Sequence, residues 1–114
     1  MSANWTEKRR FPRISIKLPL RYQIRGTPEF NRASSADLSI GGLGFITAGF
    51  IAPNSYLNIE INLSPRIINA TARVVRADSL RRSDSYQLGV EFCKLGYQEK
   101  QLLSDYINQQ RLIS

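Results

Sequence analysis

The chain has 114 residues, which is enough for one domain with its own hydrophobic core and too few to expect two. It has no histidine and one cysteine, which excludes histidine-based nucleophile systems, histidine-ligated metal sites and a disulfide framework. Its 16 Lys and Arg residues outnumber its 9 Asp and Glu residues, and the formal charge of +7 predicts attraction to phosphates, polyanions or an acidic protein surface.

The first half of the chain alternates apolar and polar residues, as half-buried strands do. Residues 14–25 predict one strand, with an edge or a bulge at Pro19 because proline lacks a backbone donor. A turn-rich stretch over residues 26–35 follows. Residues 36–40 alternate again, and residues 42–47 predict a short strand after a pair of glycines.

The second half continues this pattern up to residue 92. Residues 49–55 have the turn chemistry of a loop, and residues 56–64 give the clearest alternation in the sequence. Residues 66–77 and 86–92 predict two more strands, separated by a polar loop over residues 78–85. About six short strands joined by short loops predict an all-β fold, a small six-stranded antiparallel β-barrel.

The C-terminal segment has a different period. Over residues 97–113, the side chains of Leu102, Leu103, Tyr106 and Ile107 recur at spacings of three and four, which predicts an amphipathic α-helix. Its apolar side must cover something, either one end of the barrel or its outer wall. The sequence contains no internal repeat.

The ends and the localisation follow from composition. Residues 1–8 predict a flexible N-terminal arm and residues 9–114 a single domain. The N-terminus has no apolar stretch followed by a small-residue cleavage site, and no apolar run is long enough for a bilayer. We therefore expect a cytoplasmic protein without membrane insertion.

The sequence does not favour an enzyme. The acidic residues are scattered, with neither a paired carboxylate motif nor a metal-binding loop, so we predict no catalytic residue and no metal site. Cys93 ends a predicted strand, and with no histidine available to activate it we interpret it as a passive small side chain. A binding function remains.

The stretch RRFPR places Arg9, Arg10 and Arg13 around Pro12. Proline disfavours a helix here, so the segment is extended or turned. Arg9 and Arg13 are then up to about 13 Å apart, and a turn brings them close enough to grip one small dianion or purine. A guanidinium can pair two parallel donors with a phosphate or with the O6 and N7 atoms of guanine.

The stretch DLSIGG supplies the complementary groups. On a strand, Asp37 and Ser39 project from one face about 6.6–7 Å apart. The carboxylate can accept hydrogen bonds from N1 and N2 of guanine, and the hydroxyl can donate to a phosphate oxygen. Gly41 and Gly42 let backbone N–H groups approach a ligand without a side chain in the way.

Each stretch also has a simpler interpretation. An arginine-rich N-terminal segment can be solvated charge, and Asp37 or Ser39 can satisfy backbone groups in a turn. At these residues, however, the sequence resembles the PilZ domain family, whose signature is RxxxR followed farther along the chain by D/NxSxxG. Here Arg9 to Arg13 and Asp37 to Gly42 match the two motifs, and ARVVR (72–76) and LGVEF (88–92) resemble the later strands of the family.

The resemblance implies a six-stranded β-barrel with a C-terminal helix that binds the bacterial second messenger cyclic di-GMP. By that likeness Arg9 and Arg13 hold guanine edges and phosphates, and Asp37 reads a guanine Watson–Crick edge. Ser39 then lies near the ligand, and Gly42 permits close approach. No cofactor other than the ligand is implied.

Three basic residues are secondary candidates for the same site. Arg10 either serves a phosphate or faces water. Lys8 stands just before the first motif, where family members are thought to differ in binding one ligand or a stacked pair. Arg76 either ends its strand at a rim or follows a bulge, where its guanidinium could stack on a purine.

We therefore hypothesise an adaptor in which cyclic di-GMP orders the N-terminal arginine segment and changes the surface shown to an unidentified protein partner. One alternative is a small basic barrel that binds nucleic acid non-specifically, but Tyr22, Tyr86 and Phe92 fall on the buried parity instead of the exposed one. Another alternative is a PilZ-like protein-interaction module without a ligand.

Overall fold

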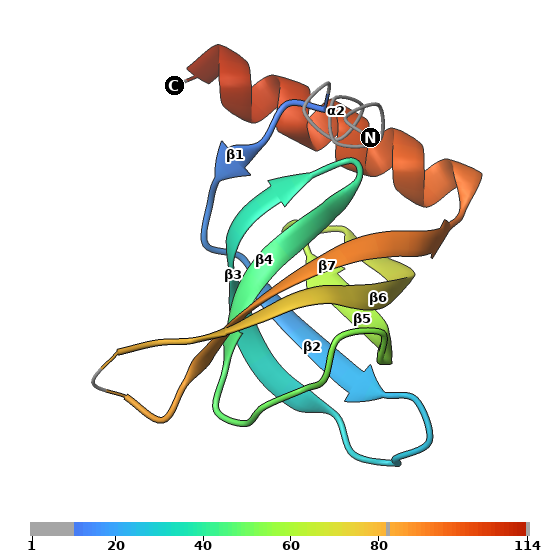
Figure 1. Ribbon diagram of the computed structural model, residues 1–114. Coiled ribbons are helices and arrows are strands. Elements are labelled where there is room, and N and C mark those ends of the chain that lie inside the picture. Colours follow the sequence, from blue (N-terminus) through green and yellow to red (C-terminus); the bar gives the residue numbers. More distant parts are fainter. Residues whose placement is uncertain (1–10, 82, 114) are drawn as a thin grey trace, which may run out of the picture.

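The computed structural model describes residues 11–81 and 83–113. Within this part of the chain the strands precede a single helix, α2, which spans Tyr97–Ile113 (Figure 1). The strands are β1 Ile14–Ser15, β2 Pro19–Ile24, β3 Asn31–Ser39, β4 Gly42–Thr47, β5 Tyr56–Asn62, β6 Ile67–Ser79 and β7 Tyr86–Leu95.

The strands form one antiparallel sheet that closes on itself. Its order is β1-β3-β2-β5-β6-β7-β4, and β3 also pairs with β4. That last pairing gives each strand from β2 to β7 a partner on both sides, so no long edge is left open. The predicted six-stranded antiparallel barrel with a C-terminal helix is confirmed, and β1 is an additional short strand.

The prediction of one continuous strand over residues 14–25 is wrong, because the chain leaves the ladder between β1 and β2. Both strands run along the same neighbour, β3, which pairs with β2 through its first half and with β1 through its second half. In the gap, the hydroxyl of Ser35 accepts a hydrogen bond from the Leu18 N–H at 2.9 Å and donates to the Ile16 carbonyl at 2.5 Å. The Ser35 side chain thus pairs two backbone groups of the gap, while the Ile16 N–H still donates to the Ala36 carbonyl at 3.2 Å and the Ser35 N–H to the Leu18 carbonyl at 2.9 Å.

Residues 31–35, which we predicted within a turn-rich stretch, belong to β3. Residues Asn31 to Ser34 pair with Tyr22 to Pro19 of β2. These residues are small or polar and show no clear alternation, so their strand conformation comes from non-local pairing with β2, which overrides local propensity. The turn is confined to residues 25–30.

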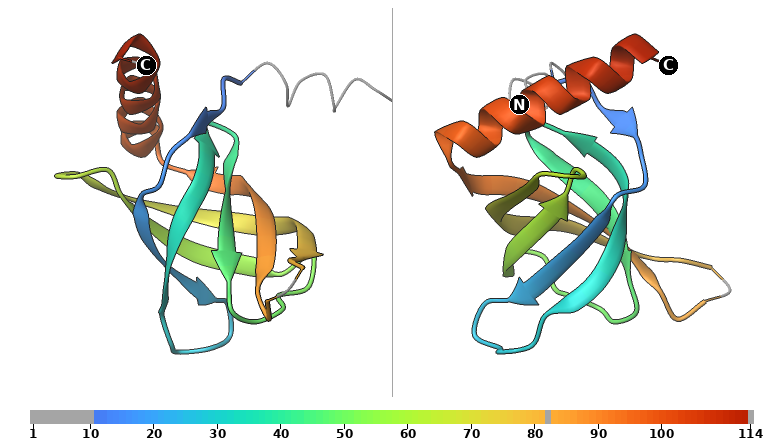
Figure 2. Two further views of the ribbon diagram at one scale, coloured as in Figure 1. Left: turned by 90° about the vertical axis from the view of Figure 1, so that its left-hand side faces the viewer. Right: turned by 180° about the vertical axis from the view of Figure 1, so that it is seen from behind.

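The core fills the barrel and continues beneath the helix. The largest fully buried side chains are Leu38, Leu43, Phe45, Leu57, Ile59, Ile61, Ile68, Val74, Leu88, Leu103 and Ile107. Leu103 and Ile107 come from α2, which lies across one end of the barrel (Figure 2). Burying such a side chain contributes about 1.5–3 kcal/mol, so the apolar stripe predicted for residues 97–113 is what fixes the helix in place.

Candidate functional site

A row of outward-facing residues crosses β3, β4, β7 and β6, which run side by side on one wall of the barrel (Figure 1). The ladders place Asp37 opposite Gly44, Gly44 opposite Gly89, and Gly89 opposite Arg76. Residues directly opposite one another share a sheet face. Gly44 and Gly89, here called the glycine floor, therefore put no side chain between Asp37 and Arg76. The Asp37 carboxylate lies against Gly44 and the Arg76 side chain against Gly89.

Arg13 reaches the Asp37 end of the glycine floor. The short ladder between β1 and β3 pairs Ser15 with Asp37, and Arg13 stands two residues earlier in the chain. Its Nη1 atom donates to Oδ1 of Asp37 in an ion pair, with the two side chains 54% and 24% exposed. The structure thus brings together these two predicted site residues, which are 24 positions apart.

Gly44 is needed next to this carboxylate. A Cβ atom at Gly44 would lie 3.0 Å from Oδ2 and 3.2 Å from Oδ1 of Asp37. Such distances are tighter than ordinary van der Waals contact, so any larger residue would push the carboxylate away from its present position. The sequence pattern did not single out Gly44, although a glycine inside a strand often marks a place of close approach.

Ser39 lines the same groove as Asp37, but its hydroxyl is already engaged. Its side chain is buried, and Oγ accepts a hydrogen bond from the Gly41 N–H at 3.1 Å. The hydroxyl also lies 3.4 Å from the Gly42 carbonyl oxygen, to which it donates. In this structure Ser39 therefore stabilises the turn between β3 and β4, which is the simpler interpretation of this motif.

Gly41 and Gly42 are small for reasons of packing. A Cβ atom at Gly42 would lie 2.0 Å from the carbonyl oxygen of Val90 in β7, and one at Gly41 would lie 3.2 Å from the ring of Phe11. The Phe11 side chain therefore rests on the turn. Both glycines line the groove. A side chain at Gly42 would clash with the backbone of β7, and one at Gly41 would press on the Phe11 ring.

Arg76 follows a bulge, one of the two alternatives that the sequence left open. The register of β6 against β7 shifts between Val74 and Arg76, which leaves Val75 as the extra residue. Arg76 bonds Oδ2 of Asp78 through Nε at 3.1 Å, in an ion pair that is about two-thirds exposed on both sides. Its guanidinium lies against Gly89, with Nε and Nη2 each 3.8 Å from where a Cβ atom of that glycine would be.

Glu91 adds a carboxylate to the groove wall, and Arg73 compensates its charge. Nη2 of Arg73 donates to Oε1 of Glu91 at 2.5 Å, and Nη1 donates to Oδ1 of Asn54 at 2.7 Å. The hydrogen bond and the charge of Glu91 raise the pKa of Arg73. Glu91 is therefore a weaker obstacle to an anionic ligand than an isolated carboxylate would be.

This wall carries an open groove of about 1090 Å³, slightly larger than the ~300–1,000 Å³ typical of ligand pockets. It contains Arg13, Asp37, Ser39 and Arg76 as well as both predicted glycines. Residues that sequence reasoning missed include Phe11, Gly44, Val75, Gly89, Glu91 and Lys100. Lys100 comes from α2, and no local pattern in the sequence marks it.

Three predicted site residues, Lys8, Arg9 and Arg10, lie outside the described residues. Within the described ranges, no group of three His, Cys, Asp or Glu side chains is placed to hold a metal ion. Nor does any described helix combine the length and apolarity that crossing a bilayer would require.

The family model of the PilZ domain matches residues 7–109, nearly the whole chain. The chain belongs to the PilZ domain family. No curated protein matches it. Among solved structures, the PilZ domain of Escherichia coli YcgR with c-di-GMP superposes with a TM-score of 0.69 at 19% identity, over 93% of this chain and 94% of that one.

Two longer chains share the fold. The Bacillus subtilis inhibitor of motility, MotI/DgrA, superposes with a TM-score of 0.81 at 22% identity, over 91% of this chain. The K. pneumonia MrkH–c-di-GMP complex gives 0.72 at 16% identity, over 90% of this chain. This PilZ chain spans 51% of the length of each of those two chains.

Proposed function

We propose that this PilZ chain is a receptor for cyclic di-GMP that works as an adaptor by changing the surface it presents when ligand binds. The observation that carries the proposal is the row formed by Asp37, the glycine floor and Arg76, with Arg13 beside Asp37. A carboxylate matches the N1 and N2 donors of guanine, and guanidinium groups suit phosphates and purine faces. The YcgR and MrkH structures with c-di-GMP, which have this fold, support the choice of ligand.

The ion pair of Arg13 and Asp37 is the state that a ligand replaces. In this ion pair, Arg13, which would bind the ligand, and Asp37, which would accept hydrogen bonds from guanine, neutralise each other. Because Arg13 is more than half exposed, such a pair contributes only about 0–1 kcal/mol, so opening it opposes binding weakly. Ligand then gives each group a partner of its own.

The remaining candidates take supporting roles in the proposal. Arg9 and Arg10, with Lys8 before them, approach the ligand from residues 1–13, and their contact with it orders that segment. Ser39, Gly41 and Gly42 shape the turn beside Asp37. The chain acts in the cytoplasm as a single binding domain over residues 9–114 with an arm over residues 1–8, and it has no catalytic role.

The site is tested by titrating cyclic di-GMP in a calorimeter into the wild type and the variants Arg13→Ala and Asp37→Ala. We expect both substitutions to abolish measurable binding. Arg66→Ala is the matched control, because Arg66 is an exposed arginine in the turn between β5 and β6, outside the groove. Unchanged affinity in both site variants would refute the assignment, and binding by none of the proteins would favour the ligand-free interaction module.

Ordering of the N-terminal segment needs a separate measurement. We expect the backbone amides of residues 5–15 to shift and lose fast motion in NMR spectra when cyclic di-GMP is added. If the ligand binds and these amides do not respond, the site stands but the proposed adaptor mechanism fails.

A further inference from the structure

A second charged surface lies on the outside of β2, the first half of β3, and β5. The ladders place Arg21 of β2 opposite Arg32 of β3 on one side and opposite Glu60 of β5 on the other. Arg21 donates to both carboxylate oxygens of Glu60, at 3.1 and 3.0 Å, and its guanidinium carbon lies 4.5 Å from the ring centre of Phe30. The two hydrogen bonds to Glu60 and the stacking on Phe30 thus restrain the Arg21 side chain.

A second arginine, just after the end of β2, also stacks on an aromatic ring. The guanidinium carbon of Arg25 lies 5.3 Å from the ring centre of Tyr56. Phe30 and Tyr56 are 40% and 41% exposed, so both aromatic rings reach solvent. Their neighbours complete a surface that we call the arginine–aromatic strip, made of Arg21, Arg25, Phe30, Arg32 and Tyr56.

The strip carries positive charge that is only partly neutralised by ion pairs within the described part of the chain. Like charges directly opposite one another on neighbouring strands destabilise a sheet, and Arg32 faces Arg21 in this way. Glu60 is occupied by its forked pair with Arg21, and in the described part of the chain Arg25 and Arg32 form no ion pair. An anion supplied from outside would relieve this repulsion.

We propose that the arginine–aromatic strip is a docking surface for an acidic face of a partner protein. Protein interfaces are enriched in arginine and aromatic residues, and the strip has three arginines and two aromatic rings. Stacking restrains the guanidinium groups of Arg21 and Arg25, and pairing with Glu60 restrains that of Arg21 further, which lowers the conformational entropy lost on binding.

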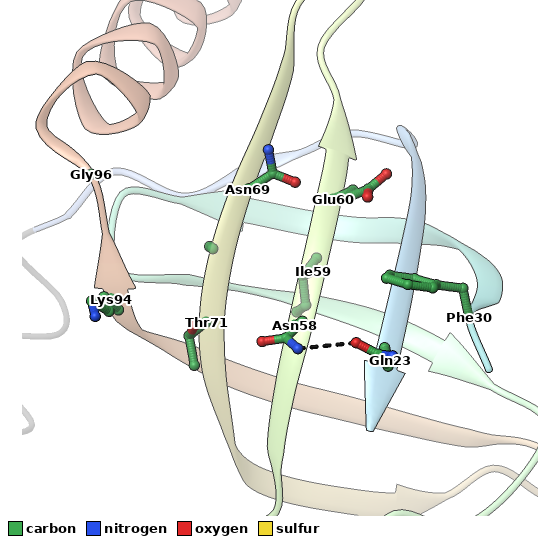
Figure 3. Close-up of a pocket in the computed structure, with 10 residues that line it drawn as sticks. Gln23, Phe30, Asn58, Ile59, Glu60, Asn69, Thr71, Lys94 and Gly96 are labelled. Atoms are coloured by element: carbon green, nitrogen blue, oxygen red, sulfur yellow. Dashed lines mark hydrogen bonds between the residues drawn. The ribbon is translucent and has the colours of Figure 1, made fainter. Parts of the chain in front are cut away.

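A shallow groove beside the strip adds hydrogen-bonding groups. It measures about 360 Å³ and is lined by Gln23, Phe30, Asn58, Asn69 and Thr71 among others. In Figure 3 the Asn58 amide points to Gln23, to which it donates at 3.1 Å, while Asn69 and Glu60 lie on neighbouring strands. Such side chains suit the polar rim of a protein interface.

These observations favour a protein over single-stranded nucleic acid. Bases bind by stacking on open aromatic faces, and here a guanidinium already covers one face of each ring. The strip shares no residue with the groove that contains Asp37, so it can be tested independently of cyclic di-GMP binding.

The test is an NMR titration of the isotope-labelled full chain with two probes: a synthetic peptide of alternating Glu and Leu, and oligo(dT). We expect the peptide to shift the amides of the strip saturably, and to bind more tightly than oligo(dT) at equal ionic strength. Arg32→Glu should weaken peptide binding by about tenfold or more, whereas Arg66→Glu, which changes the charge equally in an exposed turn, should have little effect.

Thermal unfolding of Arg32→Glu separates a binding role from a structural one. A glutamate opposite Arg21 replaces a repulsive pair with an attractive one, so Tm should stay the same or rise while peptide affinity falls. Three results would overturn the proposal: equal losses of affinity in Arg32→Glu and Arg66→Glu, tighter binding of oligo(dT) than of the peptide, or a lower Tm with unchanged peptide affinity.

Discussion

Substituting Gly42 with alanine tests whether this glycine serves the barrel itself. Its backbone does not have a positive φ, so alanine is compatible with the local conformation. The added methyl group would nevertheless lie 2.0 Å from the Val90 carbonyl oxygen and 3.0 Å from the Glu91 Cα atom. Both obstacles are backbone atoms of β7, which cannot move aside as a flexible side chain could.

The expected effect is large for one methyl group. Overpacking of this kind costs about 1–3 kcal/mol, and the rigid obstacle places Gly42→Ala at the upper end of that range. Replacing glycine with alanine also lowers the conformational entropy of the unfolded chain, which stabilises the folded protein by about 0.4–1 kcal/mol and offsets part of this cost. The net loss of about 2–2.6 kcal/mol is a large part of the ~5–15 kcal/mol that stabilises a typical domain, and should lower Tm by roughly 10 °C.

The assay is thermal unfolding followed by circular dichroism, with Gly89→Ala as the matched control. A Cβ atom at Gly89 would meet nothing nearer than Arg76 at 3.8 Å, an ordinary contact, so Gly89→Ala should unfold within a few degrees of the wild type. It should still weaken cyclic di-GMP binding, because it covers half of the glycine floor. A Gly42→Ala variant as stable as Gly89→Ala would show that the packing argument is wrong.

Three further predictions concern the barrel. Ser35→Ala leaves the buried Leu18 N–H without its 2.9 Å partner and should cost about 1–3 kcal/mol in urea unfolding; no loss would mean that water replaces the hydroxyl. Ile61→Ala should cost about 2–5 kcal/mol, whereas the same change at exposed Ile67 should cost far less. Burial raises the pKa of Tyr22, so stability should fall as pH rises above about 10, and Tyr22→Phe should flatten that decline.

Local periodicity was enough to predict the elements whose pattern matches their burial. The alternation over residues 56–64 predicted a strand, and β5 spans Tyr56–Asn62. The spacing of apolar residues over 97–113 predicted the helix, and α2 spans those residues. In both cases one face of the element is buried against the core, so the spacing of apolar residues in the sequence matches the period of the strand or helix.

Elements that depend on distant partners could not be predicted in this way. Residues 31–35 become a strand because β2 pairs with them, and nothing in their own composition indicates it. The same limit applies to the candidate site. Motif spacing suggested that Arg13 and Asp37 converge, but Gly44 and Gly89 meet only through the register of β4 against β7, which a single sequence does not contain.

The short ladder that carries Arg13 has a mechanical consequence. β1 has two residues and pairs only with β3, whereas each barrel strand is paired on both sides. Its amides should therefore exchange with solvent through a local, subglobal opening of low free energy, far below that of global unfolding. β1 can then separate from β3 while the six barrel strands stay paired with one another.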